Sequence, residues 1–370
     1  MKIIILKNNL KNSLDSVSRI VGENTNLPIL KNILIKAEKG KINIFSTDLE
    51  TAIIKTVAGK IIEEGQITVP FVIFNNIINN IQSERIDIEN RELNIFVKTD
   101  SYEAKIQGMN YEEFPIIPKI DTKNESIEIK GDSLKESFIS VMSAAQISEL
   151  RPEISGIMLD VEGEIIKFVA TDSFRLAEKT IYSTDFTNNF ERGFKIIIPL
   201  KPAQEIVKII TNKETIKIYS DENQLMIQND DITLITRLID GKFPDYISII
   251  PKNISTSLEI SRTELISALK LVSSFSSKNN EVIFKIISDQ KLVEVCSADN
   301  LLGENKYLIT AKITGEPLNI SFNWRFIIDG LKNINTETIS IGFQGDTKPS
   351  LIKWSQDNSY LYVVMPIKNN

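Results

Sequence analysis

The sequence contains no histidine in its 370 residues. That absence removes histidine-based catalytic triads, histidine-ligated zinc and the commonest general acid or base at neutral pH. A single cysteine, Cys296, excludes an internal disulfide, and its place in the alternating run "KLVEVCSAD" favours a buried structural thiol over a nucleophile. The composition therefore weighs against an enzyme that works through histidine or cysteine.

Long apolar runs are also missing, since no stretch approaches the roughly 18 residues that a membrane-spanning helix needs. No signal-peptide pattern opens the sequence, and no Walker loop, GxGxxG motif or CxxC pair occurs in it. We therefore expect a cytoplasmic protein with no membrane partner, no cofactor and no metal site.

Internal repetition is what the sequence does contain. Residues 3–17, 127–141 and 258–272 each alternate apolar and polar residues as a half-buried strand does, and then switch to helical spacing. Just before two of the helical stripes, Ser133 and Thr263 are the predicted N-caps. A second block recurs as "LPILKNILIKAEKGKINIFSTDLETAI", "RPEISGIMLDVEGEIIKFVATDSFRLA" and "NEVIFKIISDQKLVEVCSADNL".

These repeats predict three domains, at residues 1–121, 122–253 and 254–370. Each should hold about eight short strands and two helices, because hairpin-like turns separate the apolar segments. Antiparallel sheets that bury one face against helices make an α+β fold.

One stretch, "ATDSFRLAEK" at 170–179, has the residue types of an active site. A hydrolase or nuclease built from Asp172, Ser173 and Arg175 is one interpretation, which a divalent-metal activity assay would test. Asp48 and Asp299 occupy the same place in the other two repeats. An aspartate that recurs at one structural position indicates a turn residue that binds the local backbone, and we favour that interpretation.

Further motifs follow one another along the chain: "LPIL" and "STDLE", then "LRPEISGIML" and "ATDSFRLAE", then "GKFPDYISIIPK" and the terminal "YVVMPIK". In this order they resemble the bacterial DNA polymerase III beta subunit family, the sliding clamps, over essentially the whole chain. The resemblance implies a crescent of three repeated domains of the DNA clamp fold and no catalytic activity. Two crescents would join head to tail, domain 1 to domain 3, into a ring whose helices line a central hole.

The resemblance also implies a function and partners. The ring would encircle double-stranded DNA without sequence specificity and tether the DNA polymerase III catalytic subunit as a processivity factor. Other expected partners are the clamp loader, other polymerases and repair proteins, and the expected location is the nucleoid. Residues 94–109 and 273–286 are the candidate edges for self-association. The alternative is a repeat scaffold that does not encircle DNA, which a strictly monomeric chain would favour.

Any DNA-facing surface has to be local, because the net charge is −6. Helical spacing leaves several cations opposite the apolar stripes, and the family places such helices around the hole. Solvated charges on ordinary surface helices are the other interpretation. Domain 1 has Val72 and Asn79 at the matching places, so we expect it to contribute less. The candidates from helical spacing are Arg19, Lys201, Lys208, Lys270, Lys278, Arg325 and Lys332. Arg151, just before Pro152, is a further candidate, because the family often has basic residues in the corresponding loops.

In this family a groove between domains 2 and 3 receives short linear peptides. Phe174 stands where the family frequently has a smaller or imidazole side chain, and Ser248 where a basic residue is common, so the resemblance implies the groove but not its detailed shape or peptide preference. Arg175 is expected to hold a peptide carbonyl or carboxylate. The groove residues carried over onto this sequence are Ile154, Thr171, Phe174, Arg175, Leu176, Pro244, Ser248, Ile249, Val363, Val364, Met365 and Pro366.

Overall fold

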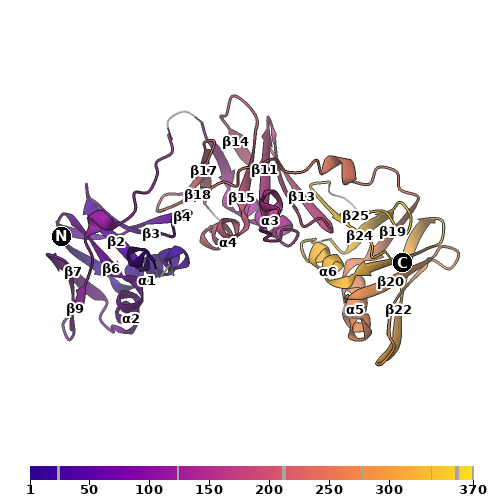
Figure 1. Ribbon diagram of the computed structural model, residues 1–370, viewed down its shortest axis with the longest axis horizontal. Helices are drawn as coiled ribbons and strands as arrows, with labels where there is room; N and C mark the ends of the chain where they lie inside the picture. Colours follow the sequence, from indigo (N-terminus) through magenta and orange to yellow (C-terminus); the bar gives the residue numbers. More distant parts are fainter. Residues whose placement is uncertain are drawn as a thin grey trace. The chain divides into compact units, whose positions relative to one another are not determined.

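The computed structural model describes residues 1–22, 26–122, 125–210, 214–276, 279–334, 336–354 and 358–368. Over these residues the chain forms antiparallel sheets and six α-helices (Figure 1). The helices are α1 (Lys7–Val17), α2 (Phe71–Asn80), α3 (Gly131–Met142), α4 (Leu200–Ile209), α5 (Arg262–Val272) and α6 (Trp324–Lys332). The predicted α+β class is confirmed.

The chain divides into two compact units. Unit 1 comprises Met1–Asp132, Thr187–Glu191 and Lys208–Leu238, and unit 2 comprises Ser133–Phe186, Arg192–Val207 and Ile239–Asn370. These units differ from the three sequence repeats because sheets continue from one repeat into the next.

Unit 1 holds a five-stranded sheet in the order β5-β1-β7-β8-β9 and nearly all of a nine-stranded sheet in the order β14-β10-β16-β17-β18-β4-β3-β2-β6. The strands of the first are β1 (Lys2–Leu6), β5 (Gly59–Glu63), β7 (Arg85–Arg91), β8 (Asn94–Lys98) and β9 (Glu103–Gln107). Those of the second are β2 (Asn32–Glu38), β3 (Lys41–Thr47), β4 (Thr51–Val57), β6 (Gly65–Pro70), β10 (Ile127–Lys130), β14 (Phe186–Asn188), β16 (Thr215–Ser220), β17 (Gln224–Gln228) and β18 (Ile232–Arg237).

Unit 2 holds a twelve-stranded sheet in the order β15-β11-β12-β13-β26-β25-β24-β19-β22-β21-β20-β23. Its strands are β11 (Gly156–Glu162), β12 (Ile165–Thr171), β13 (Arg175–Tyr182), β15 (Phe194–Pro199), β19 (Thr256–Ser261), β20 (Glu281–Ile287), β21 (Leu292–Asp299), β22 (Gly303–Gly315), β23 (Leu318–Asn323), β24 (Thr338–Phe343), β25 (Ser350–Trp354) and β26 (Tyr360–Val364).

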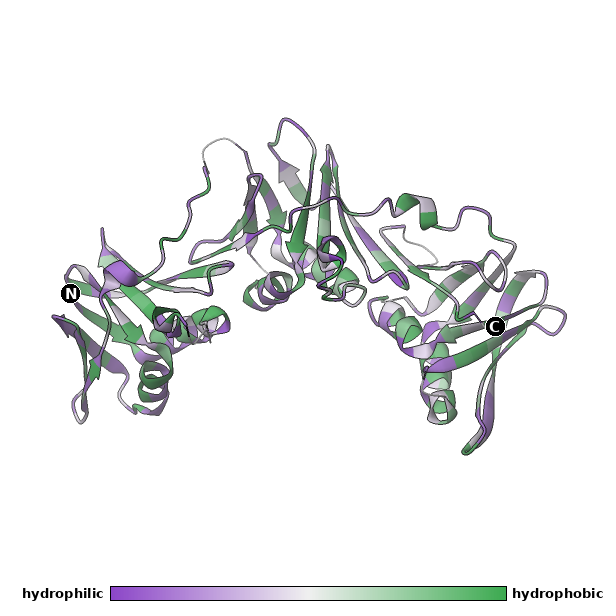
Figure 2. Ribbon diagram, viewed as in Figure 1, coloured by the Kyte–Doolittle hydropathy of each residue, from purple (hydrophilic) through white to green (hydrophobic). Residues whose placement is uncertain are grey.

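The helices bury the apolar stripes that the sequence pattern predicts. Leu10, Leu14 and Val17 are buried on α1, and the matching positions are buried on α3 and α5. Hydrophobic and hydrophilic residues accordingly mix along each helix (Figure 2). The predicted caps are wrong: Thr263 lies inside α5, and Ser261 caps that helix by accepting from Glu264 N at 3.4 Å. Each helix begins at the residue directly after its strand, so Ser133 and Thr263 already lie inside the first turn of α3 and α5.

Cys296 lies in β21 and is partly buried. Burial raises the pKa of its thiol, so little thiolate is present at neutral pH. This supports the structural interpretation of the cysteine.

Two strand pairs carry the sheets across the repeat boundaries. β4 pairs with β18 in unit 1, with Thr51 opposite Thr236, and β13 pairs with β26 in unit 2, with Arg175 opposite Val364. Both pairs are antiparallel and begin at the same step after the recurring aspartate. Joining the repeats edge to edge satisfies main-chain groups that would otherwise form exposed sheet edges.

The recurring aspartates close tight turns. In Asp48, Asp172 and Asp299, Oδ1 accepts from the backbone N–H groups two and three residues ahead, at 2.7 to 3.2 Å. The expected turn role is therefore confirmed. Asp172 has an additional partner, because its Oδ2 accepts from Arg175 Nε at 2.9 Å and its side chain is only 3% exposed.

This difference between the turns predicts unequal stability effects. Asp172→Asn keeps the backbone acceptor but loses a charged bond to a largely buried guanidinium, so unit 2 should lose about 2–3 kcal/mol of unfolding free energy. Asp48→Asn is the matched control and should cost under about 1 kcal/mol, because no ion pair involves Asp48 among the described residues. Both tryptophans, Trp324 and Trp354, belong to unit 2, so urea unfolding followed by fluorescence reports unit 2 and circular dichroism reports both units. Equal losses in the two variants would contradict this account.

Candidate functional site

A groove of about 630 Å³ lies on unit 2. The turn before β13 supplies Ser173 and Phe174, the start of α6 supplies Asn323 and Phe326, and the chain after β26 supplies its far wall. The remaining lining residues are Asn279, Met365, Pro366, Ile367 and Lys368. This groove, called here the unit-2 groove, is lined mainly by apolar and aromatic side chains with amides and one lysine.

The predicted groove residues are placed in different environments. Phe174, Met365 and Pro366 line the unit-2 groove, and the Phe174 side chain is 61% exposed. Arg175 at the start of β13 is partly buried. The carried-over residues that are buried are Ile154, Thr171, Leu176, Val363 and Val364. Of these, Leu176 and Val363 pack in a core cluster with Phe243 and Tyr246.

The linker before β19 lies beside a second cavity of unit 2, of about 470 Å³. Pro244 lines this cavity together with Tyr246 and Ile247. Ser248 and Ile249 are exposed on the following short 3₁₀ turn and line neither cavity. The predicted linker residues therefore do not line the unit-2 groove, whose walls come from the turn before β13, from α6 and from the C-terminal segment.

Arg175 is held from three sides. Its Nε donates to Asp172 and its Nη1 donates to Asp329 Oδ2 at 2.7 Å, while its guanidinium lies 4.4 Å from the ring centroid of Phe326. The ring of Phe174 stacks on the same Phe326 ring at 6.5 Å. Burial acts to lower the pKa of Arg175, but Tyr362 and the two carboxylates outweigh it, so the pKa is raised and the charge is permanent. Arg175 thus positions an aromatic wall of the groove, and two carboxylates already occupy the guanidinium that was expected to hold a peptide.

Sequence reasoning missed Phe326, Asn323, Ile367 and Lys368. On α6 the buried stripe is Ile327, Ile328 and Leu331, and Phe326 stands off that stripe and is only partly buried. A large aromatic residue outside the core stripe of an amphipathic helix was the available signal.

The predicted DNA-facing cations are exposed wherever the structure describes them, and Lys278 lies outside the described residues. Lys201 and Lys208 lie seven residues apart on α4, as Arg325 and Lys332 do on α6, so each pair shares one helix face. Arg19 follows α1 and Lys270 lies in the last turn of α5. Arg325 stacks over Trp324 at 5.3 Å, and Lys332 Nζ is 3.2 Å from Asp329 Oδ1.

Arg151 has a different setting from the other cations. It precedes a short 3₁₀ turn, and its Nη1 donates to Ser173 Oγ at 2.9 Å while its Nε contacts Glu153 Oε1 at 3.2 Å. Because Ser173 lines the unit-2 groove, Arg151 lies at the edge of that groove.

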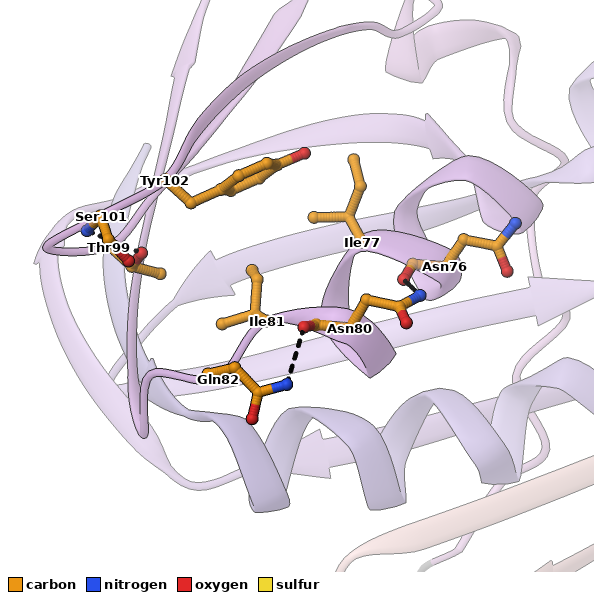
Figure 3. Close-up of a pocket in the computed structure, with 8 residues that line it drawn as sticks. All are labelled: Asn76, Ile77, Asn80, Ile81, Gln82, Thr99, Ser101 and Tyr102. Atoms are coloured by element: carbon orange, nitrogen blue, oxygen red, sulfur yellow. Dashed lines mark hydrogen bonds between the residues drawn. The ribbon is translucent and has the colours of Figure 1, made fainter.

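Unit 1 has a cavity of about 480 Å³ between α2 and the β8–β9 hairpin (Figure 3). Ile77, Ile81 and Tyr102 present apolar side chains to it, and amide and hydroxyl groups surround them. Thr99, Ser101 and Tyr102 come from the segment predicted to self-associate. The adjoining strand β9 is the last strand of its sheet, so one of its edges is free among the described strands.

The matching free edge of unit 2 is not where the sequence suggested. β20 lies inside its sheet, paired with both β21 and β23, so that part of the predicted segment 273–286 cannot offer an edge. The long strand β22 offers one instead: residues 303–310 pair with β21 alone, because β19 reaches only residues 311–315. Leu271 on α5 and Leu308 on this half of β22 are large apolar side chains that stay 58% and 49% exposed.

The described residues contain no group of three or more metal-ligating side chains. They also contain no helix that is long and apolar enough to cross a membrane. Asp172 is bonded to backbone and arginine, and Ser173 Oγ accepts from Arg151, so the hydrolase interpretation of this stretch has no free acid or activated hydroxyl.

Models of three DNA polymerase III beta subunit domains match the chain in succession. The N-terminal domain matches residues 1–118, the central domain residues 128–245 and the C-terminal domain residues 247–368. The beta sliding clamp of Synechococcus elongatus is 27% identical over 376 residues, covering 100% of this chain and 99% of the relative. That of Chlamydia muridarum is 27% identical over 370 residues with the same coverage.

Solved structures agree with these matches. The Bacillus subtilis DNA polymerase sliding clamp superposes with a TM-score of 0.95 at 26% identity, and the Thermotoga maritima DNA polymerase III beta subunit with 0.90 at 28%, each covering 100% of both chains. The chain therefore belongs to the DNA polymerase III beta subunit family, the sliding clamps, and is a non-catalytic processivity subunit of DNA replication.

Proposed function

We propose that this chain forms a head-to-tail homodimeric ring that encircles duplex DNA and tethers the DNA polymerase III catalytic subunit. The observation that carries the proposal is the match of all three family domains to the three sequence repeats along the whole chain. The nucleoid location and the partners (clamp loader, other polymerases and repair proteins) follow from that role.

Enclosure explains how a net-acidic protein can serve DNA. The net charge of −6 disfavours a broad phosphate-binding surface, whereas paired cations on α4 and α6 supply local attraction. Contacts to phosphate carry no sequence information, so they let the ring slide without breaking base-specific bonds.

A charge-removal variant tests the DNA-facing residues. Replacing Lys201, Lys208, Arg325 and Lys332 by alanine should weaken binding to linear duplex and flatten its salt dependence by about one unit of slope for each phosphate that is no longer neutralised. The matched control replaces four exposed lysines elsewhere, Lys39, Lys60, Lys119 and Lys252, with the same change in net charge. Fluorescence anisotropy between low and high salt measures both. Equal slopes in the two variants would rule out the helices as the phosphate-facing surface, and release from nicked circular DNA on linearisation would support enclosure.

The free edges of β9 and β22 are the proposed dimer contact. Each carries alternating Glu and Lys side chains, Glu103 and Lys105 on β9 and Glu304 and Lys306 on β22, so antiparallel pairing can set opposite charges across the joint. The cavity beside α2 would receive an exposed leucine of the other copy. A ring of two copies contains two such contacts, and no copy is left with an unpaired edge.

Charge placed in this contact should split the ring. Ile77→Asp in the unit 1 cavity or Leu271→Asp on α5 should convert dimer to monomer in native mass spectrometry. Ile62→Asp, on the opposite edge strand β5 of the same sheet and 46% exposed, should leave the dimer intact. A dimer that survives both Ile77→Asp and Leu271→Asp would show that the copies join elsewhere.

The unit-2 groove is the proposed peptide site. Its stacked rings, Met365 and Lys368 suit an extended segment with apolar anchors, since aromatic side chains supply large contact area and methionine adapts to varied ligands. Phe174 adds a ring that makes this groove more aromatic than the family pattern implies.

Removing the two protruding side chains should weaken peptide binding without opening the ring. Phe174→Ala with Met365→Ala should reduce the affinity for the acetylated, amidated peptide Leu-Ser-Leu-Ser-Phe at least tenfold, about 1.4 kcal/mol. Alternate residues of an extended peptide share one face, so its three apolar side chains can enter together. Ile165→Ala, at an exposed isoleucine of β12 that does not line the groove, is the control. Anisotropy with a labelled peptide measures affinity, and an unchanged value would remove this site.

A further inference from the structure

The turn that builds the unit-2 groove is duplicated in unit 1, bond for bond. Thr47 Oγ1 donates to Thr51 O at 2.8 Å and accepts from Leu49 N at 3.0 Å. In unit 2, Thr171 Oγ1 donates to Arg175 O at 2.7 Å and accepts from Ser173 N at 3.2 Å. The third turn residue has a positive φ in both, 79° at Leu49 and 76° at Ser173. The two turns therefore present side chains in the same directions.

The chain that crosses each turn is duplicated as well. At the end of β18, Arg237 N donates to Glu50 O at 2.9 Å, and directly after β26, Met365 N donates to Phe174 O at 2.8 Å. Arg237 and Glu50 thus occupy the places of the two side chains that protrude into the unit-2 groove. The linkers correspond too, with Pro115 where Pro244 stands, each directly after a buried phenylalanine.

A cavity of about 220 Å³ lies at this place in unit 1. Its walls are the turn, the ends of β4 and β18, and the linker from Pro115 to Pro118. Ala52 stands at the register position of Leu176, which opens space at the strand end. Two apolar side chains remain uncovered at the rim, since Ile116 is 94% exposed and Leu49 45% exposed. This cavity is called here the unit-1 groove.

Polar groups in the unit-1 groove are poised for a main-chain ligand. Gln224 lines it, and its Oε1 is buried without a hydrogen-bond donor among the described residues. Such an acceptor gains stability from an arriving N–H group. Glu50 and Arg237 form a 3.5 Å ion pair at the rim with about two thirds of each side chain exposed, so a peptide's charged and amide groups can replace it at little cost.

We propose that the unit-1 groove is a second peptide site, which binds a short extended segment through one aliphatic side chain and a backbone N–H donated to Gln224. The inference rests on the proposed peptide function of the unit-2 groove, whose turn and crossing chain it repeats. A cavity of roughly 150 Å³ accepts a benzene-sized group, so the space fits one aliphatic side chain. β4 and β18 each pair on both sides, so a further strand or second copy cannot add there through its backbone.

Calorimetric titration of the intact chain with the peptide Leu-Ser-Leu-Ser-Phe tests this. Wild type should bind two peptides per chain, the second at least tenfold more weakly, because the unit-1 groove is smaller and offers one anchor. Ile116→Asp should abolish only the weaker site, and Phe174→Ala with Met365→Ala only the stronger. Leu301→Asp, at a leucine 95% exposed in the turn between β21 and β22, is the matched control and should keep both.

The possible results separate the two proposals. Saturation at one peptide per chain, or two sites that persist in Ile116→Asp, overturns the second site while leaving the unit-2 groove in place. Binding that Ile116→Asp abolishes but Phe174→Ala with Met365→Ala does not would instead refute the unit-2 groove. Because Ile116 projects into solvent from a linker, its replacement leaves the core intact, which circular dichroism verifies.

Discussion

Main-chain pairing between strands of neighbouring repeats, β4 with β18 and β13 with β26, is the constraint on which the rest of the structure depends. Each pair begins at the residue that ends a tight turn closed by an aspartate, Thr51 in β4 and Arg175 in β13. The turn fixes where the strand starts, and the strand fixes which side chains stand at its end. Both grooves lie at these strand ends, so backbone hydrogen bonds set their positions, and side-chain identity decides their size and polarity.

The repeat architecture could be predicted because each repeat shows the same change from strand-like to helical spacing of its apolar residues. Helical stripes such as Leu10, Leu14 and Val17 are local, and the structure buries them as expected. The place of β20 could not be predicted, because strand order depends on which distant edges pair, and an alternating pattern marks a strand without marking its neighbours. The compact units differ from the repeats for the same reason: nonlocal pairing joins segments that the sequence separates.

The groove-lining residues that lie in sequence motifs could be predicted. Those outside the motifs could not, because only folding brings them next to the motif residues. Phe174 and Met365 lie in the recognisable segments and do line the unit-2 groove. Phe326 also lines the groove but comes from α6, and it meets Phe174 and Arg175, which lie far from it in the sequence, only in the folded chain. Asp172 and Asp329, which both bind Arg175, are 157 residues apart in the sequence (329 − 172), so no local sequence pattern predicts that they meet.

The two turns share one backbone geometry but carry different side chains. Where unit 2 has Phe174, Arg175 and Leu176, unit 1 has Glu50, Thr51 and Ala52 at matching register. The first set builds an aromatic wall braced by a buried ion pair, and the second leaves a smaller recess rimmed by an exposed one. An exposed ion pair is cheap to rearrange, whereas a buried pair with two carboxylates is not. The aromatic wall of the unit-2 groove is therefore held in place, whereas the ion pair at the rim of the unit-1 groove can rearrange.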